Sequence, residues 1–412
     1  MIYPVRSTVT EPNTFRSTPE RPSRRHRDDR PAVPRFAESG RLILAPRRRP
    51  NVYLLELGGE DDAFAAYEAE SAATGVRRIA PGLAVARGIA PERVRGLAYT
   101  HRASELIGRT DADVESARAL LEAASIDRDR DATVAVRSTD VHGSTGVSTE
   151  RAERELGQVL VDRGFSVDLE APDHLLRVAF SEGRLEGTTD PADNSAVRDE
   201  SDARGGERVS ICALGWLAAE SVRDFGARAP TDKPFFQPGS MDPLLARAVA
   251  NVAGARTGRT ILDPMCGTGG GLVEAGLVGA DVIGTDAQRK MAEGARENLA
   301  HFLESDDPSP TGVERGSWHV GRGDATRLPL ADDAVDGVVF DAPYGRQSKI
   351  DTHRLEDLVA SALAEARRVG SRAVVVADRS WRSEAREAGW ELAASFERRV
   401  HRSLTRYVLV LE

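Results

Sequence analysis

The sequence has few cysteines, few lysines and no long apolar run. Its two cysteines, Cys212 and Cys266, cannot build a disulfide framework, and neither has the C-x-x-C spacing of a zinc site. No apolar run reaches the roughly 18 residues of a membrane-spanning helix, and the N-terminus lacks the apolar core of a signal peptide. We therefore expect a cytoplasmic protein without a metal or a membrane contact.

Lysine is nearly absent. Only Lys233, Lys290 and Lys349 occur, so 53 of the 56 basic residues are arginine. Residues 1–50 carry a net charge of +7, and the remaining 362 residues carry −16. An acidic, lysine-poor body suits a salt-rich cytoplasm, which suggests a halophilic source; complete refolding at low salt would contradict this hypothesis. Because molar salt screens phosphate attraction, the acidic balance does not exclude a nucleic-acid substrate.

The first half of the chain is predicted to hold a tail and two small units. Residues 1–51 are rich in Arg, Pro, Ser and Thr and should be disordered, either as a dispensable tail or as a basic arm that tethers RNA. Residues 52–125 and 126–220 each alternate strands with helices, which indicates two α+β domains. The second contains an acidic segment, 182–208, which we predict to be a surface loop.

The second half has a different pattern. Residues 221–240 form a linker, and residues 241–412 alternate strands with helices of about 10–15 residues, which is typical of a parallel doubly wound sheet. The last two strands, over 391–400 and 405–411, are predicted to pair antiparallel and close the domain.

A glycine-rich loop follows the first strand of this large domain. Gly267 and Gly269 lie between that strand and a helix, where the absence of a Cβ lets the backbone approach a ligand. Asp263 precedes the loop, which disfavours a phosphate and favours a cationic ligand. Asp286 ends the second strand and suits a ribose, and Asp324 follows the third, where it can accept from an adenine amine. A glycine loop alone is often only a tight turn, but these three carboxylates together indicate S-adenosyl-L-methionine better than NAD.

The second motif, Asp341-Ala342-Pro343-Tyr344, ends the fourth strand. The lone pair of an exocyclic base amine is conjugated into the ring, so methylating it requires acceptors for both amine protons. The carboxylate of Asp341 can supply one acceptor, and the carbonyl of Ala342, held extended before Pro343, can supply the other. Tyr344 can stack on the base. Zinc-protease, Walker A and serine-nucleophile motifs do not occur in the sequence, so those chemistries fit it poorly.

With these motifs, residues 52–412 resemble the archaeal tRNA (guanine-10-N2)-methyltransferases. The likeness is strongest over residues 235–243, 263–270 and 341–346. It implies a Rossmann-like seven-stranded methyltransferase domain at 241–412, preceded by a ferredoxin-like domain and by a THUMP domain that grips the acceptor end of tRNA. The family's catalytic motif is usually Asp-Pro-Pro-Tyr, and here Ala342 replaces the first proline, which makes the loop less rigid.

The resemblance also implies roles for individual residues. Asp341, Ala342, Pro343 and Tyr344 are the expected catalytic set. The expected cofactor-binding set is Pro238, Gly239, Ser240, Asp263, Pro264, Cys266, Gly267, Thr268, Gly269, Asp286, Asp324 and Ala325.

The predicted function is the methylation, once or twice, of guanosine N2 in tRNA at position 10, by an enzyme acting as a monomer. One alternative is methylation of guanine N2 or adenine N6 in another RNA or in DNA. The alternative of a different class is a non-catalytic THUMP RNA-binding protein.

Overall fold

The computed structural model describes residues 51–185, 206–343, 352–401 and 404–412. The predicted disorder of residues 1–51, except for Asn51, and the function of Tyr344 therefore concern parts of the chain outside the described residues. The described chain forms two large sheets and a two-stranded ribbon.

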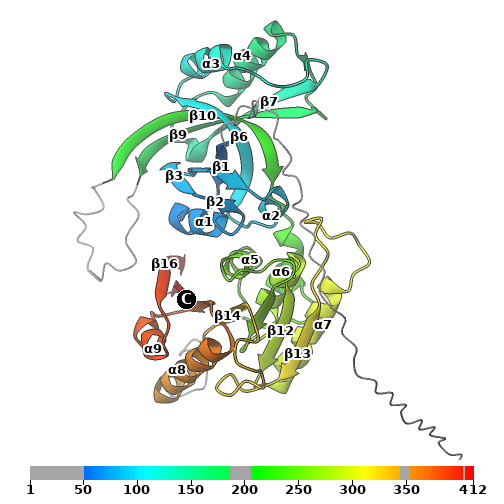
Figure 1. The fold of residues 1–412 in the computed structure, drawn as a ribbon, viewed down its shortest axis with the longest axis vertical. Coiled ribbons are helices and arrows are strands. Elements are labelled where there is room, and N and C mark those ends of the chain that lie inside the picture. Colours follow the sequence, from blue (N-terminus) through cyan, green and yellow to red (C-terminus); the bar gives the residue numbers. More distant parts are fainter. Residues whose placement is uncertain (1–50, 186–205, 344–351, 402–403) are drawn as a thin grey trace, which may run out of the picture. The chain divides into compact units, whose positions relative to one another are not determined.

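The N-terminal half is built on one mostly antiparallel sheet (Figure 1). Its strands are β1 (Tyr53–Leu57), β3 (Arg77–Ala80), β4 (Leu83–Ala86), β6 (Thr100–Thr110), β7 (Thr133–Asp140), β8 (Ser166–Val167), β9 (His174–Leu185) and β10 (Glu207–Glu220). They lie in the order β3-β4-β1-β6-β10-β9-β7-β8. The antiparallel pair β6 and β10 joins the segments predicted as separate domains into a single sheet.

The helices of this half show how side-chain caps determine where helices begin. Asp113 accepts a hydrogen bond from the Ser116 N–H ahead of α3 (Val114–Ala123), and Ser148 caps α4 (Thr149–Asp162) in the same way. The sequence predicts the cap at Ser148, whereas Asp113, predicted as the first residue of its helix, is the cap instead. The two helices lie side by side (Figure 1). The remaining helices are α1 (Asp62–Ala69) and α2 (Pro91–Val94).

Two predicted boundaries in this half are wrong. Residues 60–74 have helical composition, which predicts one helix there, but α1 ends at Ala69 and β2 (Ala73–Thr74) pairs with β5 (Gly88–Ile89). The predicted acidic loop is also too long: β9 continues through Leu185 and β10 begins at Glu207, paired to each other at those residues. The rest of that segment, 186–205, lies outside the described residues.

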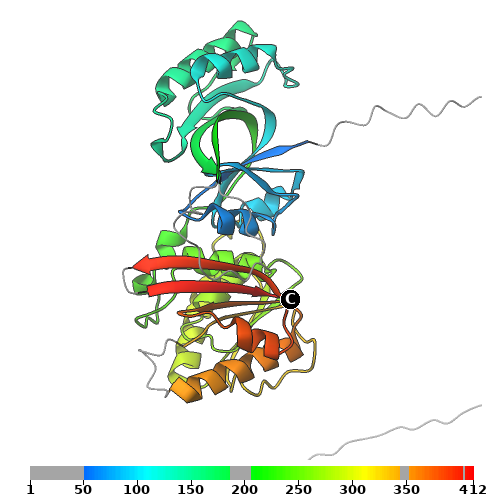
Figure 2. The ribbon, with the colours of Figure 1, turned by 90° about the vertical axis from the view of Figure 1, so that its left-hand side faces the viewer.

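The C-terminal half contains a seven-stranded sheet. Its strands are β11 (Thr260–Asp263), β12 (Asp281–Asp286), β13 (Trp318–Arg322), β14 (Gly337–Asp341), β15 (Ala373–Ala377), β16 (Leu392–His401) and β17 (Leu404–Leu411), in the order β13-β12-β11-β14-β15-β17-β16. β11 to β15 are parallel, and β17 runs antiparallel to both β15 and β16. The two long red strands of Figure 2 are this antiparallel pair. The predicted doubly wound sheet and its closing pair are confirmed.

Helices cover both faces of this sheet because its strands are apolar on both sides. They are α5 (Pro243–Val252), α6 (Gly270–Leu277), α7 (Arg289–Leu303), α8 (Thr352–Val369) and α9 (Arg382–Glu387). In β14, Val338 and Phe340 pack in the cluster that contains α8 and α9 residues. Val339 between them packs in the cluster of α5, α6 and α7. The carboxyl ends of β11, β12 and β14 therefore meet between the two helical layers.

Candidate active site

The glycine loop, residues 264–269, connects β11 to α6 in a conformation that requires glycine. Gly267 and Gly269 have φ angles of 51° and 75°, in the left-handed region. A Cβ on Gly269 would lie 2.6 Å from Leu299 Cδ1 and 3.2 Å from Ala295 Cβ, on helix α7. A Cβ on Gly267 would meet nothing within 4 Å, so that side of the loop has open space.

Backbone contacts with the end of β12 hold the loop. The Cys266 N–H donates to the Thr285 carbonyl at 2.9 Å, and the Thr285 hydroxyl donates to the Pro264 carbonyl at 2.9 Å. Asp286 accepts from the Gly267 N–H at 3.0 Å with Oδ2, and from the Gln288 N–H at 2.8 Å with Oδ1. The structure thus brings together the first two predicted cofactor carboxylates, on neighbouring strands.

Asp263 is the buried member of this group. Only 6% of it is exposed, and its Oδ1 accepts from the Met265 N–H at 3.0 Å. Burial raises the pKa of Asp263 well above its usual range, and the nearby carboxylates of Asp286 and Asp341 add to the rise. Burial, with Asp263 and Asp286, likewise raises the pKa of Cys266, which keeps that thiol neutral. A site with three converging carboxylates is suited to a cation.

We expect Asp263→Asn to raise the thermal midpoint of the ligand-free protein at neutral pH. The folded state favours the protonated Asp263 carboxyl, so protonation of Asp263 stabilises the fold at low pH. This stabilisation is lost as the pH rises from about 4, the ordinary aspartate pKa, through the raised pKa of the folded state. The gain over wild type should therefore shrink as the pH falls. Thermal unfolding between pH 4 and 8 measures it.

Asp281→Asn is the control for this experiment. Hydrogen bonds from Ser317 lower the pKa of this exposed carboxylate, so its replacement should give no gain at neutral pH. A midpoint of Asp263→Asn at or below that of wild type across the range would contradict the account.

Asp324 lies beyond β13, close to the end of β12. The Gly323 N–H donates to the Asp286 carbonyl at 3.1 Å, which ties the two strand ends together. Asp324 is exposed, and hydrogen bonds from the Thr326 N–H and hydroxyl lower its pKa. It therefore carries a charge at the surface, whereas Ala325 beside it is buried.

The segment before α5, residues 235–240, also contacts the glycine loop. Ser240 Oγ donates to the Gln237 carbonyl at 2.8 Å and lies 3.2 Å from the Thr268 hydroxyl. Asn298 on α7 donates to the Thr268 carbonyl and bonds both backbone groups of Phe235. Pro238 and Gly239, between these anchors, are exposed. The structure thus places the predicted residues 238–240 beside the loop.

The end of β14 carries the predicted catalytic motif. β14 pairs with β11 in parallel, so Asp341 lies on the strand next to Asp263. Ala342 is 2% exposed, and its N–H donates to the Val376 carbonyl on β15 at 2.8 Å. A proline has no N–H and could not donate this bond. Alanine at position 342 is less rigid than the family's usual proline, but its hydrogen bond fixes the backbone to β15. Within the described ranges, no group donates a hydrogen bond to the Ala342 carbonyl.

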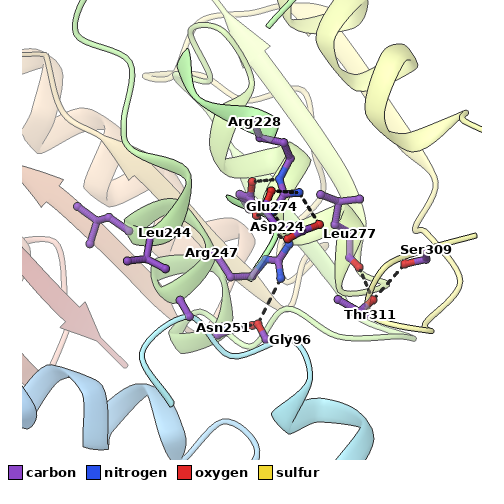
Figure 3. Close-up of polar contacts among 12 residues, drawn as sticks. Gly96, Asp224, Arg228, Leu244, Arg247, Asn251, Glu274, Leu277, Ser309 and Thr311 are labelled. Carbon is purple, nitrogen blue, oxygen red and sulfur yellow. Dashed lines mark hydrogen bonds and ion pairs between the residues drawn. The ribbon is translucent and has the colours of Figure 1, made fainter. Parts of the chain in front are cut away.

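Two features were missed by the sequence analysis. The first is an ion cluster on helix α6, shown in Figure 3. Glu274 is 1% exposed and accepts from Arg228 at 2.6 Å and from Arg247 at 2.8 Å. Arg228 also pairs with Asp224 at 2.7 Å. This cluster connects α6, which starts at the glycine loop, to α5 and to the short helix η3 (Phe225–Arg228) of the linker.

The second missed feature is Lys233, which is buried beside the loop and 7% exposed. A Cβ on Gly270 would lie 2.9 Å from its Nζ. The available signal was its rarity, since it is one of three lysines in the chain and precedes the Pro-Phe-Phe of the cofactor-side motif.

A cavity of about 590 Å³ lies at the amino-terminal ends of the parallel strands, opposite to the glycine loop. Its lining includes the ion pairs Arg259–Asp336 and Arg372–Glu412. These residues precede or flank the starts of β11, β14 and β15, so the cavity is not part of the Asp263–Asp341 site. No helix in the part of the chain that the structure describes is long and apolar enough to cross a membrane.

Comparison with known proteins gives both family matches and a structural neighbour. The family described as RMKL-like, methyltransferase domain, matches residues 230–408. The tRNA (guanine(10)-N2)-dimethyltransferase of Methanothermobacter thermautotrophicus is 34% identical over 77% of this chain and 83% of that protein. The protein of the same name from Pyrococcus abyssi is 33% identical over 46% of this chain and 55% of its own length, so the chain spans about half of that relative.

More distant similarities include an RNA methyltransferase and a solved structure. The U6 snRNA (guanine-N(2))-methyltransferase THUMPD2 of Mus musculus is 29% identical over 120 residues, which are 29% of this chain and 21% of that protein. The crystal structure of TrmN from Thermus thermophilus is 22% identical, with a TM-score of 0.43, over 88% of this chain and 99% of that one.

The seven-stranded sheet with its antiparallel closing pair, and the glycine loop beside three carboxylates, define a Rossmann-like methyltransferase. Within that class, the chain belongs to the tRNA (guanine(10)-N2)-dimethyltransferase family. The family resemblance inferred from the motifs is thereby confirmed.

Proposed function

We propose that this protein uses S-adenosyl-L-methionine to methylate the exocyclic N2 of guanosine 10 in tRNA, once or twice. The observation that carries the proposal is the placement of Asp341 and the Ala342 carbonyl next to the carboxylate-lined glycine loop. Membership of the family supplies the choice of base and RNA.

The residues around the loop fit this cofactor. The open side of Gly267 leaves space for a ligand, and the acidic group of Asp263, Asp286 and Asp341 favours a positively charged one. We assign the ribose hydroxyls to Asp286 and the adenine amine to Asp324, with Ala325 beside it. The methionine end would lie along residues 264–269 and 238–240. When bound, the cofactor would supply an electrophilic methyl group, whose bond to sulfur is broken, and would leave as S-adenosylhomocysteine.

The protein's own contribution to the reaction is positioning and charge. Asp341 accepts one proton of the guanine amine and the Ala342 carbonyl accepts the other, so the nitrogen lone pair is turned toward the methyl group. As the new N–C bond forms, the nitrogen becomes positively charged, and the Asp341 carboxylate stabilises that charge and can take the departing proton. Pro343 and Tyr344 would frame the base.

The N-terminal half is the proposed RNA-binding part. We assign residues 52–125 to a ferredoxin-like domain and residues 126–220 to a THUMP domain. The continuous sheet through β6 and β10 supports a rigid connection between them. Such a connection would keep the proposed THUMP domain at a constant distance from the proposed ferredoxin-like domain.

A second candidate is guanine-N2 methylation in another RNA. The relatives named for tRNA and for U6 snRNA share the same base atom and differ in the RNA. These relatives therefore support guanine N2 as the target atom more strongly than they support tRNA as the substrate. The target atom and the RNA need separate tests.

A tRNA carrying inosine at position 10 tests the target atom. Inosine lacks only the exocyclic amine of guanosine, so the base can enter the site but offers no N2. We expect methyl transfer to the guanosine tRNA and none to the inosine tRNA. Equal transfer to both would show that the protein methylates a different atom.

A further inference from the structure

Helix α6 begins with backbone donors that have no acceptor among the described residues. Its N-cap, Gly269, offers no side chain to cap the helix. Throughout the described residues, no group accepts a hydrogen bond from the N–H of Gly270, Gly271 or Leu272. The first turn of a helix carries a partial positive charge, so this end of α6 is suited to an anion.

Lys233 adds a full positive charge at the same place. Its Nζ is the nearest atom to the position that a Cβ on Gly270 would take, at 2.9 Å. Among the described residues, no carboxylate lies within ion-pair distance of it, and no hydrogen bond to it is formed. Burial lowers the pKa of Lys233, while Glu274 acts in the opposite direction; Arg228 and Asp242 are the other charged groups nearby.

Glu274, the acidic residue whose charge acts most strongly on Lys233, already has two ion-pair partners. Both oxygens of Glu274 bond the guanidinium groups of Arg228 and Arg247. A buried ammonium without a counter-charge is costly. The anion that would relieve this cost must therefore come from outside the described chain, and the first turn of α6 is where it would be held.

The backbone next to Lys233 is already fixed in the ligand-free protein. Two residues further on, Phe235 bonds Asn298 through both of its backbone groups, and its ring fills the space over Gly294, where a Cβ would lie 2.0 Å from Phe235 Cδ1. Because the segment is anchored to α7, little freedom is lost when a ligand meets the lysine.

Opposite charges face neighbouring glycines at this helix start. Lys233 Nζ lies against Gly270, and Asp263 Oδ2 lies 3.7 Å from the Cβ position of Gly271. A cation and a carboxylate side by side match the two charges of an α-amino acid, whose carboxylate would face the lysine and whose ammonium would face the aspartate.

We propose that Lys233, together with the first turn of α6, binds the α-carboxylate of the cofactor's methionine moiety. The assignment rests on the proposed function, because it takes the ligand to be S-adenosyl-L-methionine. It makes Lys233 a specificity-determining residue that distinguishes this cofactor from nucleosides without an amino acid.

Calorimetric titration with two ligands tests the assignment. S-adenosylhomocysteine carries the amino acid, and 5′-methylthioadenosine has the same nucleoside and thioether without it. We expect Lys233→Met to weaken S-adenosylhomocysteine binding by about tenfold to a hundredfold, as for a lost charge-assisted hydrogen bond. Binding of methylthioadenosine should stay within about twofold, which also shows that the variant is folded. Lys233→Arg should retain part of the affinity.

Lys290→Met is the matched control, since Lys290 is exposed on α7 and near the same phenylalanine, 5.7 Å from its ring. It should bind both ligands as wild type does. Unchanged S-adenosylhomocysteine binding by Lys233→Met, or an equal loss for both ligands, would overturn the proposal while leaving the proposed function intact. A wild-type protein that binds neither ligand would overturn the proposed function itself.

Discussion

Asp341→Ala should lower the rate of methyl transfer by about 10²- to 10⁴-fold. This is the usual effect of removing a proton acceptor or a charge-stabilising group from a transition state. Asp341 ends β14 next to the glycine loop, and the neighbouring Ala342 backbone is anchored to β15, so the substitution should remove the acceptor without moving the strand. Single-turnover rates with saturating RNA and cofactor measure the loss directly.

The variant should still bind the cofactor. S-adenosylhomocysteine affinity is expected to stay within a few-fold of wild type, although Asp341 is among the charged neighbours of Asp263. Asp357→Ala, at an exposed position of α8, is the control and should react normally. Turnover of Asp341→Ala close to that of wild type would refute the mechanism.

Glu274→Ala should destabilise the methyltransferase domain by about 3–5 kcal/mol, the usual cost of breaking a buried ion pair from one side. The substitution removes the carboxylate that both Arg228 and Arg247 contact, and these arginines are 4% and 1% exposed. Arg228 would keep Asp224, whereas Arg247 would lose its only ion pair among the described residues. Urea unfolding followed by tryptophan fluorescence gives the change in free energy.

Glu293→Ala provides the comparison. Its ion pair with Arg289 on α7 is 2.7 Å long, but both side chains are more than half exposed. Such a surface pair contributes at most about 0.5 kcal/mol. Glu274→Ala should therefore lower the free energy of unfolding far more than Glu293→Ala does. A loss below about 1 kcal/mol for Glu274→Ala would mean that the cluster does not stabilise α6.

Local signals explain what could be predicted from the sequence. Ser148 caps its helix through a bond from the Arg151 N–H, three positions on, so composition and periodicity suffice to find this end. Asp263, Asp286 and Asp341 each end a strand, and parallel strands end on one edge of a sheet. Their convergence therefore follows from topology alone.

Contacts between distant segments explain what could not be predicted. Arg228 and Glu274 are 46 positions apart, and neither has a neighbour in sequence that reveals the pairing. The long antiparallel pair β6 and β10 arises in the same way, from strands in segments that looked like separate units. The length of β9 and β10 was missed because their acidic ends have a loop-like composition, although pairing between the strands satisfies their backbone.

The most direct test of the central claim is nucleoside mass spectrometry of tRNA incubated with the protein and S-adenosyl-L-methionine. The account predicts N2-methylguanosine, N2,N2-dimethylguanosine or both, and their loss when guanosine 10 is replaced. N6-methyladenosine as the product, or the same methylguanosine yield from the tRNA without guanosine 10, would contradict it.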